Sequence, residues 1–204
     1  MTTTLTVSVL LSIALYSAVC SVTPGPNNLM LLSSGMRFGV RRTLPHMVGI
    51  SLGAAVLTLM CGLGLAEMFE LYPILQTVLK WIGMSYLLWL AWGIARSGAP
   101  ESSQTQEHAK PLGFWGAAAF QWVNPKAWVM SVGLISAYLP AHPSLETIVI
   151  ASIALALVNF PCISVWAVAG QKLRSFLQNP RSLQWFNWTM AGLLVLSMVP
   201  AVMV

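Results

Sequence analysis

Apolar residues gather in six long segments along the chain, and short polar segments separate them. Each apolar segment reaches the roughly 20 residues that an α-helix needs to cross a bilayer core. The pattern therefore predicts an all-α integral membrane protein. The six expected transmembrane helices cover residues 8–34, 44–66, 74–96, 112–137, 146–170 and 184–204.

The first apolar segment could also be read as a secretory signal peptide. Such a peptide starts with a positively charged region and has an apolar core of roughly 7–15 residues. Residues 1–4 contain no Lys or Arg, and the apolar run from Leu5 to Leu32 is much longer than such a core. We therefore interpret the segment as a transmembrane helix.

Composition supports the same class. Of the 204 residues, 57% are hydrophobic and 7% are charged, whereas soluble domains carry roughly 25% charged residues. Cys20, Cys61 and Cys162 lie in three different segments and show no CxxC spacing. This pattern favours apolar filling over a disulfide framework or a metal site, and we expect neither a metal nor another cofactor.

The net charge is +5, and eight of the ten Lys and Arg residues lie in alternate loops. The other loops, at residues 1–7, 67–73 and 140–145, contain no Lys or Arg. By the positive-inside rule this asymmetry places both termini outside the cytoplasm, and anionic lipid headgroups are the only partner that the charge requires. The cations of the predicted cytoplasmic side are Arg37, Arg41, Arg42, Arg96, Lys110, Lys172, Arg174 and Arg181.

One long polar stretch divides the chain into two parts. We expect a first three-helix half at residues 1–97, a cytoplasmic linker at 98–111 and a second three-helix half at 112–204. Because each half contains an odd number of helices, the second half enters the membrane from the opposite side. The halves are therefore predicted to form an inverted repeat, as in many secondary transporters.

The first expected helix is interrupted by the sequence TPGPNN, at residues 23–28. Proline has no N–H and its ring clashes with the carbonyl four residues earlier. Pro24 therefore frees the carbonyl of Cys20, and Pro26 frees that of Val22. Because an unsatisfied polar group is costly in hydrocarbon, such a break persists only inside protein or beside water.

Each half has a proline beside an asparagine at intermediate depth, where a new helix can begin. Pro26 suits a first turn, and Asn27 and Asn28 can satisfy free donors; in the second half Asn124 is a good N-cap and Pro125 suits the next position. Both half-helices would then present unpaired N–H groups at mid-membrane, which forms a carboxylate site. The alternative is that these prolines only kink packed helices.

Two lysines lie inside expected helices. Lys126 is deep in the fourth helix, where a cation is costly and usually faces a cavity. It is predicted to pair with a substrate carboxylate or to titrate during coupling; the alternative is a structural lysine bound to the freed carbonyls of the opposite break. Lys80 lies near the outer end of the third helix, where its stem can reach the headgroups and anchor the helix.

Other polar and aromatic residues are weaker candidates. The pair Gly49 and Gly53 has the GxxxG spacing that brings helices close together. The stretch 159–161, Asn-Phe-Pro, is expected to break the fifth helix, with Asn159 lining a cavity or marking only a kink. Trp122 and Trp128 could wall a pocket. His46, at the cytoplasmic boundary, is interpreted as an interfacial polar residue.

Two sequences resemble the signatures of the LysE/RhtB superfamily of bacterial amino-acid exporters. They are TPGPNNLMLLSSGMRFGVRRTLPHMVGISLG, at 23–53, and KPLGFWGAAAFQWVNPKAW, at 110–128. Their wording is most similar to the cysteine and O-acetylserine exporter branch, although Pro125 departs from that branch. The residues that bear the resemblance are Pro24, Gly25, Pro26, Gly39, Arg41, Gly49 and Gly53, then Phe114, Gln121, Asn124 and Lys126.

The resemblance implies export of small amino acids, such as cysteine, O-acetylserine, homoserine or threonine, across the bacterial cytoplasmic membrane. It also implies an ion gradient as the energy source, with a proton as the expected coupling ion, and allows a homodimer. The chain has no Walker-type phosphate loop. The expected substrate-binding residues are Pro24, Gly25, Pro26, Asn27, Asn28, Gln121, Asn124, Pro125 and Lys126.

Other classes of function are less favoured by the residues. No Asp or Glu lies deep in an expected helix. An enzyme embedded in the membrane would therefore lack a catalytic cluster. A cationic substrate such as lysine would lack a partner for its second ammonium group. A structural role would leave Lys126 and the breaks unexplained. A passive channel for small polar solutes is the main alternative, because broken helices also line pores.

Overall fold

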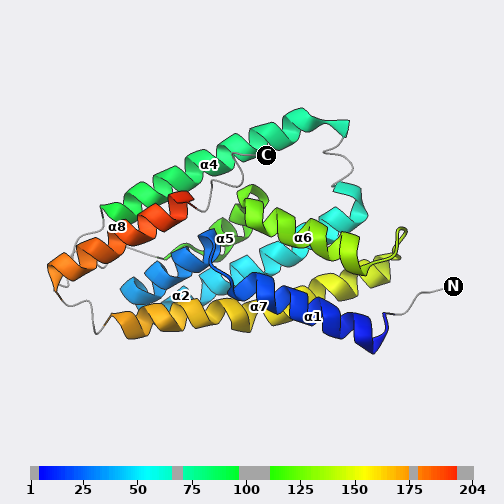
Figure 1. The fold of residues 1–204 in the computed structure, drawn as a ribbon, viewed down its shortest axis with the longest axis horizontal. Coiled ribbons are helices and arrows are strands. Elements are labelled where there is room, and N and C mark those ends of the chain that lie inside the picture. Colours follow the sequence, from blue (N-terminus) through cyan, green and yellow to red (C-terminus); the bar gives the residue numbers. More distant parts are fainter. Residues whose placement is uncertain (1–4, 66–70, 97–110, 175–178, 197–204) are drawn as a thin grey trace.

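The computed structural model describes residues 5–65, 71–96, 111–174 and 179–196, and every regular element in these ranges is helical (Figure 1). The prediction of an all-α chain is therefore confirmed. The linker at 98–110, with Lys110, lies outside the described residues, and so does the side chain of Lys80. The α-helices are α1 (Val7–Val22), α2 (Pro26–Met60), α4 (Pro73–Ala95), α5 (Phe114–Phe120), α6 (Pro125–Tyr138), α7 (Leu145–Leu173) and α8 (Pro180–Leu196).

Two of the expected segments are interrupted where the prolines predict. The first consists of α1 and the start of α2, which are separated at residues 23–25. The fourth consists of α5, a 3₁₀ turn (η2, Gln121–Val123) and α6, with the extended Asn124 before Pro125. A proline therefore begins the second helix at each interruption, where its missing N–H costs no helical hydrogen bond.

The first expected cytoplasmic loop is a sharp bend inside α2 rather than an extended loop. Gly39 has φ 77°, a left-handed conformation that glycine adopts without steric cost. Around the bend, Thr43 donates to the Gly39 carbonyl at 2.8 Å, and the Val40 N–H donates to Gln171 at 2.6 Å. After the bend α2 continues to Met60 and into a π turn (η1, Cys61–Leu65).

The stretch 159–161 does not break the fifth helix, which corrects the expectation from its sequence. α7 runs from Leu145 to Leu173 with Pro161 inside it. α2 packs along α7 through glycines: a Cβ added to Gly35 would overlap the Ala167 carbonyl, and one added to Gly170 would overlap that of Leu32. This close packing holds α7 in place despite its proline.

The GxxxG pair brings two helices together, as predicted. A Cβ on Gly53 would lie 2.7 Å from the Cα of Ala118 in α5, and one on Gly49 would overlap the Phe114 carbonyl. His46, in contrast, is not interfacial. Its side chain is only 2% exposed, and among the described residues neither ring nitrogen has a hydrogen-bond partner.

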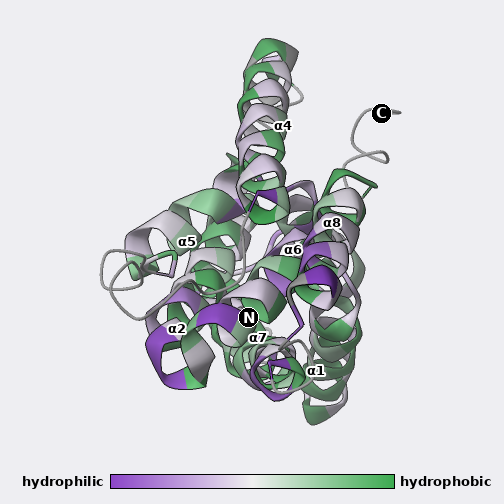
Figure 2. Cartoon of the chain, turned by 90° about the vertical axis from the view of Figure 1, so that its left-hand side faces the viewer, coloured by the Kyte–Doolittle hydropathy of each residue, from purple (hydrophilic) through white to green (hydrophobic). Residues whose placement is uncertain are grey.

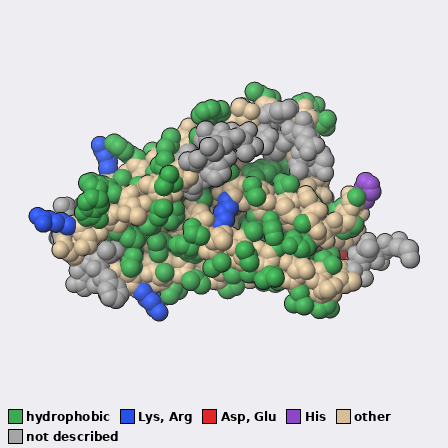
Figure 3. All heavy atoms as spheres, in the orientation of Figure 1, with side chains coloured by type: hydrophobic (Ala, Val, Ile, Leu, Met, Phe, Trp, Pro, Cys, Tyr) green, Lys and Arg blue, Asp and Glu red, His purple; other side chains and the backbone are tan. Residues whose placement is uncertain are grey.

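The exterior is apolar, and the cations are concentrated at one end. Figure 2 shows hydrophobic residues along most of the helical surface, with hydrophilic ones at the helix ends that face the viewer. Figure 3 shows Lys and Arg at the end where α2 bends and α7 finishes, and one more in the middle of the face. By length and composition, Pro26–Leu65 and Leu145–Leu173 are able to cross a membrane.

Candidate functional site

The break after α1 leaves carbonyls that side chains satisfy. As the prolines predict, the carbonyls of Cys20 and Val22 lose their helical partners. Thr23 donates its hydroxyl to the Cys20 carbonyl at 2.9 Å, and Trp166 of α7 donates its indole N–H to the Val22 carbonyl at 3.1 Å. These two carbonyls are therefore satisfied by one local side chain and by one from α7, which lies far along the sequence.

Asn27 and Asn28 act mainly as side-chain donors, not as caps. The Nδ2 of Asn28 donates to the carbonyls of Ser21 at 2.8 Å and Thr23 at 2.7 Å. The cap position itself is Gly25, which has no side chain to accept a hydrogen bond. Among the described residues, the backbone N–H groups of Asn27 and Asn28 consequently have no acceptor. The start of α2 keeps the free donors that an anion requires.

The start of α6 differs from this expectation. Asn124 caps it as predicted, with its side-chain oxygen accepting from the Lys126 N–H at 3.1 Å. The N–H groups of Ala127 and Trp128 both donate to the Asn124 carbonyl, at 3.0 and 3.3 Å. Because Pro125 has no N–H, the described first turn of α6 has no unpaired donor. The prediction that both half-helices present free N–H groups is therefore wrong for α6.

An amide pair joins the two breaks. Asn27 donates to Oε1 of Gln121 at 2.8 Å, and Gln121 donates back to Oδ1 of Asn27 at 3.2 Å. Gln121 is fully buried and also donates to the Ala117 carbonyl at 2.9 Å. A buried amide is costly unless it is hydrogen-bonded, so this reciprocal pair fixes the distance between the start of α2 and the turn before α6.

Lys126 reaches from the second break to the first. Its ammonium donates to the Thr23 carbonyl, to the Thr23 hydroxyl at 3.0 Å and to the Pro24 carbonyl at 3.2 Å. These contacts agree in part with the alternative of a structural lysine: Lys126 binds carbonyls of the opposite break, but those of Thr23 and Pro24 and not the freed carbonyls of Cys20 and Val22. A Cβ on Gly25 would lie 2.7 Å from Lys126 Cδ, so glycine at this position leaves the path of the lysine open.

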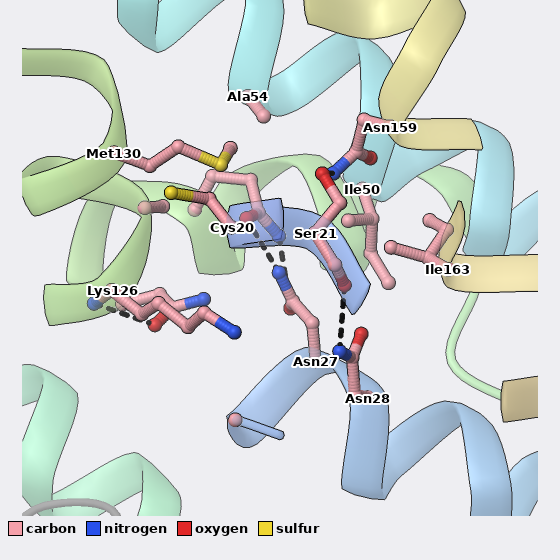
Figure 4. Close-up of a pocket in the computed structure, with 14 residues that line it drawn as sticks. Cys20, Ser21, Asn27, Asn28, Ile50, Ala54, Lys126, Met130, Asn159 and Ile163 are labelled. Carbon is pink, nitrogen blue, oxygen red and sulfur yellow. Dashed lines mark hydrogen bonds between the residues drawn. The ribbon is translucent and has the colours of Figure 1, made fainter. Parts of the chain in front are cut away.

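A third polar group lies on the opposite wall. Asn159 of α7 donates to Ser21 Oγ at 2.8 Å and accepts from Ser51 Oγ at 2.9 Å, and all three side chains are buried. In Figure 4, Asn159, Ser21, Asn27 and Asn28 turn toward one another around the cavity. The expectation that Asn159 lines a cavity agrees with its position.

These groups surround a cavity of about 30 Å³, which has room for water but not for a whole amino acid. Of the nine expected binding residues, Pro24, Pro26 and Pro125 are outside its lining. Trp122 and Trp128 are also outside it: they pack edge to face, 6.5 Å between ring centroids, beside Leu57 and Cys61. The lining residues are Cys20, Ser21, Gly25, Asn27, Asn28, Ile50, Ala54, Gln121, Asn124, Lys126, Ala127, Met130, Asn159 and Ile163.

Several lining residues were not predicted from the sequence. Ser21, Ile50 and Ile163 sit in ordinary apolar helical stretches, and nothing in their spacing marks the cavity-facing side. Cys20 was interpreted as filler, yet its position four residues before Pro24 already placed it at the break. That spacing is the one signal that could have identified it.

Comparison with known proteins identifies the family to which the chain is similar. The family model for the LysE type translocator matches residues 18–201. A protein of Klebsiella pneumoniae named cysteine/O-acetylserine efflux protein is 36% identical over 182 residues, covering 88% of this chain and 90% of its own. Proteins of the same name from Salmonella typhimurium and Escherichia coli are 36% and 35% identical, with the same coverage. No solved structure matches the chain.

Proposed function

The chain belongs to the LysE-type translocator family, and we propose on this basis that it exports a small neutral amino acid of the cysteine or O-acetylserine class. The proposed location is the bacterial inner membrane, with both termini outside the cytoplasm. The relatives named as efflux proteins, the apolar exterior and the cations at one end support this proposal.

We place the substrate in the cavity between the two breaks. Its carboxylate binds the free N–H groups of Asn27 and Asn28, beside the amide pair of Asn27 and Gln121. The positive end of the α2 dipole favours an anion at this point. Lys126 supplies the only charge among the described lining residues. The free donors of α2 are the observation on which this proposal depends.

The two halves are proposed to be inverted repeats that move relative to each other during transport. Each half contributes an interrupted helix, a long helix and a final helix. The long helices touch where Ser51, in the part of α2 after its bend, donates to Asn159 of α7, and the final helices α4 and α8 lie side by side (Figure 1). α4 and α8 run in opposite directions, as an inverted repeat requires. Rocking of one half against the other would expose the cavity to each side in turn.

Transport in inside-out vesicles tests this function. We expect saturable uptake of L-cysteine against its gradient, and a protonophore should collapse the accumulation if a proton is the coupling ion. Lys126→Ala and Asn124→Ala should each lower the rate by about tenfold or more, which corresponds to about 1.4 kcal/mol. Flux that never exceeds equilibrium would indicate a channel instead.

The chain contains its own matched controls. Asn179, Pro180 and Arg181 repeat the Asn-Pro-cation sequence at the start of α8, where Asn179 accepts from the Arg181 N–H at 2.9 Å. Both side chains are exposed and lie outside the cavity. Asn179→Ala and Arg181→Ala should therefore leave transport unchanged. Transport that survives the Asn124 and Lys126 variants equally well would show that the site is assigned wrongly.

A further inference from the structure

We propose that the carbonyls at the end of α1 bind the α-ammonium group of the substrate, and that Lys126 occupies this subsite as a tethered competitor. This inference rests on the proposed function, because it assigns the second charged group of the same substrate. It makes Lys126 a group that the substrate displaces, not one that first attracts it.

The subsite already holds an ammonium. Three oxygens, the Thr23 carbonyl, the Thr23 hydroxyl and the Pro24 carbonyl, accept from Lys126 Nζ. An alkylammonium has three N–H donors and no acceptor, so an α-ammonium group can make the same three bonds. The carbonyl end of α1 also carries the negative end of a helix dipole, which favours a cation.

The other carbonyls of the break do not depend on Lys126. Those of Cys20, Ser21 and Val22 accept from neutral side chains, which belong to Thr23, Asn28 and Trp166. Within the described parts of the chain, the Pro24 carbonyl accepts from Lys126 alone. The first break is thus held by neutral donors on short or packed side chains and by one charged donor, the ammonium group at the tip of the long Lys126 side chain. Only the charged donor can leave while the rest of the break stays intact.

The acceptor carbonyls after α1 and the free N–H groups at the start of α2 are placed to suit the ammonium and the carboxylate of a zwitterionic amino acid. The carbonyls of residues 23 and 24 come directly after the last residue of α1, and the free N–H groups of residues 27 and 28 lie in the first turn of α2. An α-amino acid carries its ammonium and carboxylate on one carbon, so it can contact both helix ends at once. Because no other lining residue is charged, the incoming carboxylate is also the group with which the displaced Lys126 ammonium can pair.

The cavity is too small for substrate while Lys126 stays in place. Its volume is about 30 Å³, and the lysine stem lies against Gly25, where an added Cβ would be 2.7 Å from Cδ. Substrate entry therefore requires the lining to open, and in this proposal the long Lys126 side chain is the lining group that moves. When Lys126 leaves the first break, the Pro24 carbonyl loses its hydrogen bond. The α-ammonium group of the substrate then restores that bond.

Equilibrium binding to the purified, reduced protein separates the two charged subsites. The probes are L-cysteine, cysteamine, which lacks the carboxylate, and 3-mercaptopropionate, which lacks the ammonium. Lys126→Met removes the competitor at nearly constant length, and we expect it to tighten cysteamine binding by about tenfold or more. The same variant should weaken 3-mercaptopropionate binding, because the carboxylate loses its cation. Lys126→Arg keeps a cation and should bind cysteamine as weakly as the wild type.

A second measurement needs no variant. N-acetyl-L-cysteine should bind the wild type about tenfold more weakly than L-cysteine, since its amide nitrogen cannot donate three hydrogen bonds. If L-cysteine binds but cysteamine binding is unchanged or weaker in Lys126→Met, or if N-acetylation has no effect, the ammonium subsite is wrong and the carboxylate site stands. If L-cysteine does not bind at all, the proposed substrate class is wrong, and this inference with it.

Discussion

The two helix breaks start from similar sequences, a proline beside an asparagine, and satisfy their backbones in opposite ways. At the second break Asn124 caps α6 with its own side chain and carbonyl, so the break closes with local groups. At the first break Thr23 and Asn28 satisfy three carbonyls locally, whereas the carbonyls of Val22 and Pro24 depend on Trp166 of α7 and Lys126 of α6. The donors at the start of α2 remain free.

This difference indicates that the two helix breaks have different roles. A break that satisfies itself is a fixed support, and the second break uses that support to project Gln121 and Lys126 toward the first. A break that also relies on distant side chains can exchange those partners when a ligand enters. We therefore expect substitutions at the first break to change transport and binding, and matched substitutions at the second to act mainly through position and stability.

The strongest test is Gly25→Val. Gly25 has extended backbone, with φ 179°, so valine is accepted there without backbone strain. Its side chain would instead occupy the path of Lys126 and separate the ammonium from the first break. Charge-assisted hydrogen bonds contribute about 1.5–3 kcal/mol each, so we expect vesicle transport to fall by more than about tenfold, with normal amounts of protein in the membrane.

Gly113→Ala is the control for this substitution. Gly113 precedes α5 in the second half with φ −76°, and an added Cβ would meet nothing within 4 Å. We expect wild-type transport. If Gly25→Val transports normally, the contact between Lys126 and the first break is not part of the cycle, and the two breaks are functionally alike.

A comparison of Asn28→Ala with Asn124→Ala measures how each break is stabilised. Asn28 is 3% exposed and satisfies two carbonyls. Its loss leaves the buried Ser21 carbonyl unpaired and removes one of the two donors to the Thr23 carbonyl, and we expect a decrease of about 2–4 kcal/mol in unfolding free energy. Loss of the Asn124 cap should cost about 1 kcal/mol. Denaturant unfolding in detergent measures both, with Asn179→Ala as a second cap control. An equal or larger loss for Asn124→Ala would contradict the different stabilisation of the two breaks.

Local chemistry explains what the sequence could predict. The absent N–H of proline identified the freed carbonyls of Cys20 and Val22, and the Asn-Pro pair identified the cap of α6, because both effects act within a few residues. The depth of Lys126 marked it as unusual. None of these arguments requires knowledge of how the helices pack.

The partners across the fold could not be predicted. Trp166 lies 144 residues from Val22, and Asn27 lies 94 residues from Gln121, so helix packing alone brings them together. The prolines at 26 and 161 look alike in sequence, yet one begins a helix and the other lies inside one. The second lies in a helix that packs closely on α2 near Gly35 and Gly170, and neighbouring helices make a proline tolerable inside a membrane helix.

Thr23→Val should have the mildest effect, because it removes one neutral bond to a carbonyl and only one of the three acceptors of the Lys126 ammonium. Its hydroxyl donates to the Cys20 carbonyl and accepts from Lys126, and valine keeps its shape without either bond. Each such bond is worth about 0.5–1.5 kcal/mol, so we expect transport to change by about two- to tenfold. Thr23→Ser, which keeps the hydroxyl, should stay near wild type. A stability loss greater than that of Asn28→Ala would mean that the first break is held locally, as the second is, and the distinction between the two would fail.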